Sequence, residues 1–168
     1  AAALPIAGLT ALQCLRDLGR VGPGSRVLIN GGSGGVGTFA VQLARLMGAE
    51  VTAVCSGRNA EMVRALGAHH VIDYTAEDPL DSGPWDLFFD AVAATSYPRA
   101  RDSLAPRGVY VHTDPRGKDF LWAALTALTP GRRARGFLVR PRRRDLEELV
   151  GMVADGRLRP VIEKELPL

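Results

Sequence analysis

Cysteine is scarce in this sequence of 168 residues, which contains only Cys14 and Cys55. Cys14 falls in a predicted helix and Cys55 in a predicted strand, so we interpret both as small buried apolar residues in a reducing compartment, the cytoplasm. The two cysteines do not have the spacing of a metal-ligand set, and we therefore predict no structural zinc and no metal site in this chain.

Several longer signatures are missing as well. No apolar run approaches the roughly 20 residues that span a bilayer, and no basic segment precedes an apolar run at the start of the chain. The sequence has neither the G-x-x-x-x-G-K-[ST] of P-loop enzymes nor the G-x-S-x-G turn of serine hydrolases. We therefore expect no membrane partner, no targeting signal, no P-loop and no serine nucleophile.

The sequence is mildly basic, with a formal net charge of +3 at pH 7. Seven arginines gather between residues 132 and 144, but Phe137 is the only aromatic residue among them. Nucleic-acid surfaces usually interleave basic and aromatic side chains. We interpret this stretch as a solvated edge strand guarded by charge, and predict no nucleic-acid partner.

Glycines dominate the most informative stretch, where Gly32, Gly34 and Gly37 form G-x-G-x-x-G. The apolar run 26–30 precedes them and the helix-compatible run 38–47 follows. In that context the glycines permit a tight turn and a close approach of the backbone to a pyrophosphate, and the helix start offers free N–H groups. A plain glycine-rich turn is the alternative interpretation. The motif favours a dinucleotide site.

Predicted strands alternate with predicted helices along the whole chain. The strands are 26–30, 50–56, 70–74, 85–92, 108–113 and 135–139, and the helices are 4–18, 38–47, 59–66, 98–104, 118–128 and 144–154. This alternation predicts an α/β protein of one domain, residues 1–168: a Rossmann-type, doubly wound, mostly parallel six-stranded sheet in three αβα layers.

The end of the second predicted strand indicates which dinucleotide is preferred. NAD sites carry an acidic residue there, about 20 residues past the glycines, to bind the ribose hydroxyls. This chain has Cys55-Ser56-Gly57-Arg58-Asn59 instead. Ser56 can donate a hydrogen bond to a 2′-phosphate and Arg58 can pair with it, so we predict NADP(H) rather than NAD. The alternative is that Arg58 is an ordinary solvated charge.

Six motifs together resemble the medium-chain dehydrogenase/reductase superfamily, and most of all its quinone-oxidoreductase branch. They are AGLTALQCL, NGGSGGVG, GAEVTAVCSGRN, LGAHHVIDY, DLFFDAV and the C-terminal run FLVRPRRRDLEELVGMVADGRLRPVI. The resemblance covers essentially the whole chain and implies its Rossmann cofactor domain. A GroES-like catalytic domain would complete the family fold, so we expect this chain to be an excised domain.

The resemblance also implies a set of cofactor-binding residues. The pyrophosphate would be bound by Gly32, Gly34, Gly35 and Val36, and the 2′-phosphate and adenosine by Ser56, Arg58 and Tyr74. Two further cofactor-binding residues, Val92 and Ala93, follow the fourth strand. The residues toward the nicotinamide would be Thr10, Phe137, Leu138 and Val139. Two positions differ from the family pattern: relatives often carry a lysine where this chain has Asn59, and a glycine where it has Ala93. No catalytic side chain is assigned.

The activity implied is an NADP-dependent oxidoreductase of the quinone reductase type, which transfers hydride from NADPH to a quinone or an α,β-unsaturated carbonyl. The isolated domain is expected to be inactive, and pairing of the sixth strand would give a homodimer. Two alternatives remain: the cofactor domain of a zinc-dependent alcohol dehydrogenase, and a non-catalytic nucleotide-sensing module. His69 and His70 are interpreted as surface or edge residues, and His112 as a packed strand residue. For Asp86 and Asp90, which flank a strand, loop hydrogen bonding and catalysis are equally good explanations.

Overall fold

The structure is a computed structural model that describes residues 4–114, 117–128 and 130–162. Within them, six strands form one sheet of parallel neighbours in the order β3-β2-β1-β4-β5-β6. The strands are β1 Arg26–Asn30, β2 Glu50–Cys55, β3 His70–Asp73, β4 Trp85–Asp90, β5 Leu104–His112 and β6 Arg133–Gly136. This order is that of doubly wound dinucleotide-binding domains, so the predicted fold class is confirmed.

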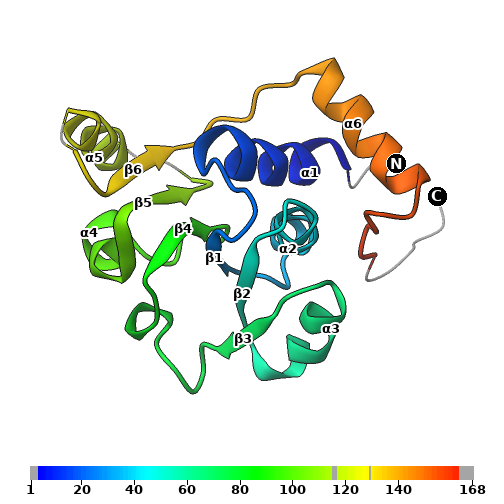
Figure 1. Cartoon of the computed structure of the whole chain (residues 1–168), viewed down its shortest axis with the longest axis horizontal. Helices are drawn as coiled ribbons and strands as arrows, with labels where there is room; N and C mark the ends of the chain where they lie inside the picture. The colour runs from blue at the N-terminus through cyan, green and yellow to red at the C-terminus, as the bar shows by residue number, and fades with distance from the viewer. Residues whose placement is uncertain (1–3, 115–116, 129, 163–168) are drawn as a thin grey trace.

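Helices cover both faces of this sheet. They are α1 Leu4–Gln13, α2 Gly35–Leu46, α3 Ala60–Ala65, α4 Tyr97–Ala100, α5 Gly117–Ala127 and α6 Arg143–Ala154. Short turns η1 Cys14–Leu18, η2 Gly57–Asn59, η3 Pro79–Asp81 and η4 Arg101–Ser103 extend or join them. In Figure 1, α1, α2, α3 and α6 lie on one side of the strands, and α4 and α5 on the other. No helix in the described ranges is long and apolar enough to cross a membrane.

The strands β1, β2 and β4 are largely apolar because both of their faces are buried. Val27 and Ile29 of β1 point into the core beneath α1 and α2, whereas Leu28 points into a second core beneath α4. Cys14 and Cys55 are both buried in the first of these cores, as predicted. Burial raises the pKa of both thiols, which leaves them protonated and unreactive near neutral pH.

Helix α1 is apolar around most of its circumference because neighbours surround it. It packs against α2 and against α6, and Leu9, Leu12 and Ala11 are all buried. Its last turn widens into the π-helical turn η1, where the N–H of Gly19 donates to the carbonyl of Cys14 at 2.8 Å. Through these contacts α1 joins the glycine-rich helix α2 to the C-terminal helix α6.

The sixth strand begins two residues and ends three residues before its predicted position, since β6 is Arg133–Gly136 rather than 135–139. Ala134 faces the core beneath α4, and its N–H donates to the Thr126 hydroxyl of α5 at 3.0 Å. Phe137 turns into the opposite core, so the chain leaves the sheet there. The prediction of a helix over 98–104 was also too long: α4 and η4 end at Ser103, and β5 begins at Leu104.

Candidate cofactor-binding site

The glycine loop between β1 and α2 is held in one conformation by backbone contacts. Gly31 adopts a φ of +84°, and the N–H groups of Gly31 and Gly32 both donate to the carbonyl of Val54, at 3.1 and 2.9 Å. A Cβ on Gly37 would overlap the carbonyl of Gly31, and one on Gly32 would lie 2.8 Å from the Ala53 side chain. The glycines therefore let α2 begin directly against β1 and β2.

The first turn of α2 has free hydrogen-bond donors. Gly34 is the N-cap, and its carbonyl accepts the N–H of Thr38 at 2.9 Å. The N–H groups of Gly35, Val36 and Gly37 have no acceptor among residues 4–114, 117–128 and 130–162. No acidic side chain occupies this turn. Three free donors and the positive end of the helix dipole suit an anion such as a pyrophosphate.

Two clefts meet at this helix start, where the strand order reverses between β1 and β4. One holds about 470 Å³ and is lined on its outer side by Tyr74, Leu80 and Arg99. The other holds about 430 Å³ and is lined by residues that include Ile6 and Val36. Gly31, Gly34 and Val92 line both clefts. An elongated ligand can therefore extend from one cleft to the other across the free N–H groups.

Asp90 fixes the loop that separates the two clefts. This fully buried carboxylate accepts the N–H groups of Val92 and Ala94, both at 3.3 Å, and of Thr95 at 2.9 Å. It also accepts the Asn30 amide at 3.0 Å and the Tyr110 hydroxyl at 3.2 Å. Asp90, the last residue of β4, therefore makes the loop hydrogen bonds that the sequence analysis gave as one of its two explanations.

The same loop leaves Val92 half-exposed between the clefts, with 53% of its surface accessible. The next residue, Ala93, adopts a φ of +52°. In this left-handed region the Cβ of an L-residue comes too close to the backbone, so a glycine suits the position better.

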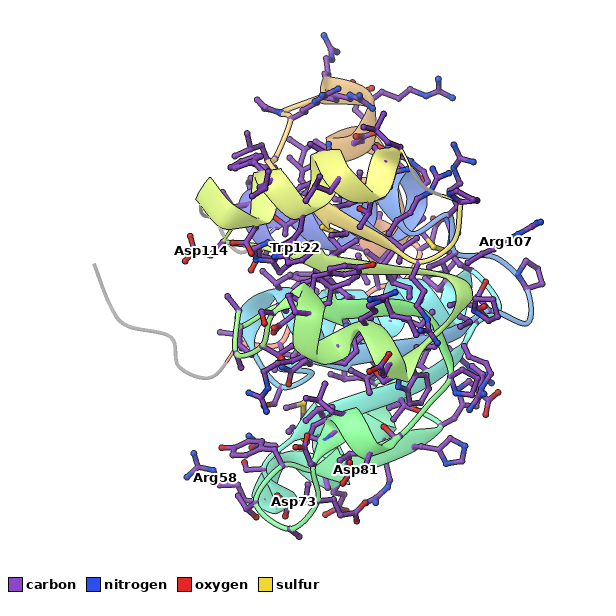
Figure 2. The ribbon with its side chains drawn as sticks, turned by 90° about the vertical axis from the view of Figure 1, so that its left-hand side faces the viewer. Arg58, Asp73, Asp81, Arg107, Asp114 and Trp122 are labelled. Atoms are coloured by element: carbon purple, nitrogen blue, oxygen red, sulfur yellow. The ribbon has the colours of Figure 1, made fainter. Side chains whose placement is uncertain are left out.

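Of the predicted 2′-phosphate residues, Tyr74 lines the first cleft, and Ser56 and Arg58 follow Cys55, which also lines it. Arg58 of η2 is exposed, and it forms no ion pair with any residue in the described part of the chain. Figure 2 shows it extending from the same end of the molecule as Asp73. Tyr74 is 60% exposed and lines the cleft. Asn59 donates to Ser33 at 3.1 Å and to Ser56 at 3.3 Å, so it joins the glycine loop to the end of β2.

Asp73 is a residue that the sequence analysis missed. It ends β3 directly beside Cys55 in the sheet register, so its carboxylate reaches the turn that carries Arg58. The N–H and hydroxyl of Thr75 donate to it at 3.0 and 2.7 Å, and the N–H of Gly57 donates as well. These hydrogen bonds hold the pKa of Asp73 below its usual range. An acidic residue therefore lies near the carboxyl end of β2, although residues 55–59 of that end include none.

The remaining predicted residues are not gathered around the glycine loop. Thr10 is buried in α1, one turn after Ile6 and Ala7, and lines neither cleft. Phe137 is buried, and with Leu138 it lines a third cleft of about 440 Å³ beside η1. Val139 follows them and is 40% exposed. Their contacts with a nicotinamide stay a prediction.

The three histidines occupy the positions expected of packing and surface residues. His112 is 5% exposed, its ring stacks on Tyr110 with centroids 5.6 Å apart, and its Nε2 lies 3.8 Å from Asp119. His69 and His70 are exposed at the far end of β3. Among the described residues, no group of three or more His, Cys, Asp or Glu side chains could hold a metal ion.

Comparison with protein families gives a match over most of the chain. The family model described as zinc-binding dehydrogenase matches residues 66–168. A solved structure, the quinone oxidoreductase from Coxiella burnetii, superposes with a TM-score of 0.86 at 37% sequence identity, over 97% of this chain and 51% of that one.

Curated proteins give the same result. The chain is 38% identical to a chloroplast envelope quinone oxidoreductase homolog of Arabidopsis thaliana, over all of this chain and 54% of the relative. It is 36% identical to a mitochondrial NAD(P)H oxidoreductase of Homo sapiens, over 99% of this chain and 49% of the relative. The chain thus spans about half the length of the curated relatives it matches.

Proposed function

Because this chain belongs to the zinc-binding dehydrogenase family of the medium-chain dehydrogenase/reductase superfamily and is quinone-oxidoreductase-like, we propose that it binds NADPH as the cofactor domain of an oxidoreductase. One observation carries the proposal. The N–H groups of Gly35, Val36 and Gly37 are free within the described ranges and lie where two clefts meet. The residues present therefore fit a dinucleotide whose pyrophosphate crosses the start of α2.

Each half of the cofactor has a place in this arrangement. The adenosine enters the cleft lined by Tyr74 and Leu80, and the nicotinamide half enters the cleft lined by Ile6 and Val36. The unpaired guanidinium of Arg58 pairs with the 2′-phosphate, and this supports NADPH over NADH. Asp73 acts against that preference, because its carboxylate is close to the same turn and repels a 2′-phosphate.

The reaction we propose is hydride transfer from NADPH to a quinone or an α,β-unsaturated carbonyl. NADPH supplies the hydride when bound. The protein binds and orients the NADPH and excludes water from it. In this chain the loop fixed by Asp90 places Val92 between the two clefts, so it separates the adenosine from the nicotinamide half. The similarity to a quinone oxidoreductase of Coxiella burnetii and to a quinone oxidoreductase homolog of Arabidopsis thaliana supports the quinone as acceptor.

Calorimetric titration of the chain with NADPH and with NADH tests the proposal. We expect both nucleotides to bind with one site per chain, and NADPH to bind about tenfold more tightly, as one added charge-assisted contact allows. Equal or tighter binding of NADH would refute the NADPH preference. Binding of neither nucleotide would refute the proposed function.

A further inference from the structure

Two buried glutamines form the same unusual contact at opposite ends of α6. Gln13 of α1 donates to the carbonyl of Arg140 at 2.7 Å and accepts the N–H of Arg140 at 3.0 Å. Gln42 of α2 donates to the carbonyl of Arg159 at 2.9 Å and accepts the N–H of Arg159 at 2.8 Å. Each side-chain amide thus satisfies both backbone groups of one residue more than a hundred positions away.

The Gln13 contact belongs to a larger buried network. Its amide also donates to the carboxylate of Asp145 at 2.8 Å, and Arg16 pairs with the other oxygen of that carboxylate at 2.9 Å. Gln13 is 3% exposed and Asp145 is 4% exposed. These bonds fix the Gln13 side chain, because a buried amide that left them would lose several partners at once.

The backbone held by Gln13 lies on the cofactor side of the molecule. Residues 137–142 follow β6, and since neighbouring strands are parallel, they leave the sheet at the same edge as the glycine loop. Figure 1 shows this connection passing α1 on its way to α6. In this strand order a dinucleotide lies across the sheet edge, with one mononucleotide over β1–β3 and the other over β4–β6.

We propose that Gln13 is a positioning residue, which holds the connection 137–142 over the half of the sheet that receives the nicotinamide. This inference rests on the proposed function, in which Arg58 and Tyr74 assign the adenosine half to the β1–β3 side. Residues beyond Phe137 have no strand partner in the described ranges, so Gln13 supplies a backbone pairing that the sheet does not. Its loss would leave Leu138 and Val139 free to move.

The test compares Gln13→Met with Gln42→Met, a matched control that removes the same two-way contact at the other end of α6. NADPH and 2′-phospho-ADP-ribose, which lacks only the nicotinamide ring, are titrated by calorimetry into the full chain and both variants. We expect Gln13→Met to weaken NADPH about tenfold and 2′-phospho-ADP-ribose less than about twofold. Gln42→Met should leave both affinities within about twofold of the unsubstituted chain.

Two results would overturn the inference. Equal weakening of both ligands by Gln13→Met would make its role a general structural one, and so would equal weakening of NADPH by the two variants. If Gln13→Met does not fold, Gln13→Asn, a neutral amide too short to keep both contacts with Arg140, is measured in its place with the same expectations. Absence of binding of either ligand to the unsubstituted chain would refute the proposed function itself, a result distinguishable from the other two.

Discussion

At the scale of single residues, the balance of two opposite charges decides which nucleotide the site prefers. Arg58 lies in the turn η2, and Asp73 reaches that turn from the end of β3. In the described part of the chain, only the carboxylate has hydrogen-bond partners. A free guanidinium favours a 2′-phosphate, whereas a neighbouring carboxylate repels it. The preference for NADPH is therefore the difference between two effects.

Substitution of Arg58 by alanine removes the attractive effect. We expect Arg58→Ala to weaken NADPH about tenfold and to leave NADH within about twofold, because NADH has no 2′-phosphate. Calorimetry with both nucleotides measures this. Arg64→Ala on α3, also exposed, is the matched control and should change neither affinity. Loss of NADPH and NADH affinity by the same factor would remove Arg58 from the 2′-phosphate site.

Substitution of Asp73 by asparagine removes the repulsive effect while keeping a hydrogen-bond acceptor. We expect Asp73→Asn to raise the ratio of NADPH to NADH affinity about threefold, the size of a screened interaction between like charges near a protein surface. The ratio should fall toward that of the unsubstituted chain as salt is added. A lower ratio than in the unsubstituted chain would mean that Asp73 serves the site only by anchoring the Arg58 turn.

The Asp73 position also shows where residue-level prediction from sequence fails. In NAD sites an acidic residue is expected at the end of the second strand, about 20 residues past the glycines. This chain has Ser56 and Arg58 there. Asp73 lies at the end of the third strand and reaches the same place only through the register of β2 and β3. A linear motif does not contain that register, whereas Gly34, Gly35 and Val36 were predictable because their contacts are local.

At the scale of elements, the junction of β1 and α2 depends on one glycine more than on the others. A Cβ at Gly37 would overlap the Gly31 backbone, whereas a Cβ at Gly35 meets nothing within 4 Å. We expect Gly37→Ala to lower the free energy of unfolding by about 3 kcal/mol or more, because backbone must move. Gly35→Ala should keep that energy or raise it by up to about 1 kcal/mol, since alanine favours a helix.

Urea denaturation of the two variants tests this contrast, and Gly35→Ala adds a second readout. Its new methyl group would lie in the cleft beside the free N–H groups, so NADPH should bind more weakly to a protein that is fully stable. Equal stability of the two variants would contradict the close packing of α2 on β1.

Element boundaries were predicted less well than element types, and β6 shows why. Arg135 to Val139 is a β-compatible run, but the strand ends at Gly136, after which Phe137 enters the core beneath α1. The backbone that follows is held by hydrogen bonds between Gln13 and Arg140, which are 127 residues apart in the sequence. A local pattern carries no information about such a contact. The buried strands β1, β2 and β4 were predicted well because their apolar runs follow from burial on both faces.

At the scale of the whole molecule, Asp145 links the first and last helices and makes stability depend on pH. Burial acts to raise its pKa, but hydrogen bonds from Gln13 and Arg16 outweigh it and lower the pKa. A carboxyl whose pKa is lowered by folding stabilises the protein fully above its unfolded value of about 3.9, and this contribution is lost as pH falls below that value. The chain should therefore lose stability below about pH 4.

Asp145→Asn measures this contribution. At pH 7 we expect the variant to have a lower free energy of unfolding than the unsubstituted chain. Near pH 3 the difference should be smaller, because the ionic contribution of Asp145 declines once pH falls below the unfolded value of about 3.9. Asp155→Asn, an exposed residue just after α6, is the control and should show a small difference at both pH values. A difference for Asp145→Asn that is the same at pH 7 and pH 3 would contradict the ionic role.

The central claim is that the first turn of α2 binds the pyrophosphate of a dinucleotide. Backbone amide chemical shifts, recorded by NMR during titration of the full chain with NADPH, test it most directly. We predict the largest changes at the N–H groups of Gly35, Val36 and Gly37, with smaller ones at Tyr74 and Val92. Saturable NADPH binding that leaves those three amides unshifted would contradict the claim.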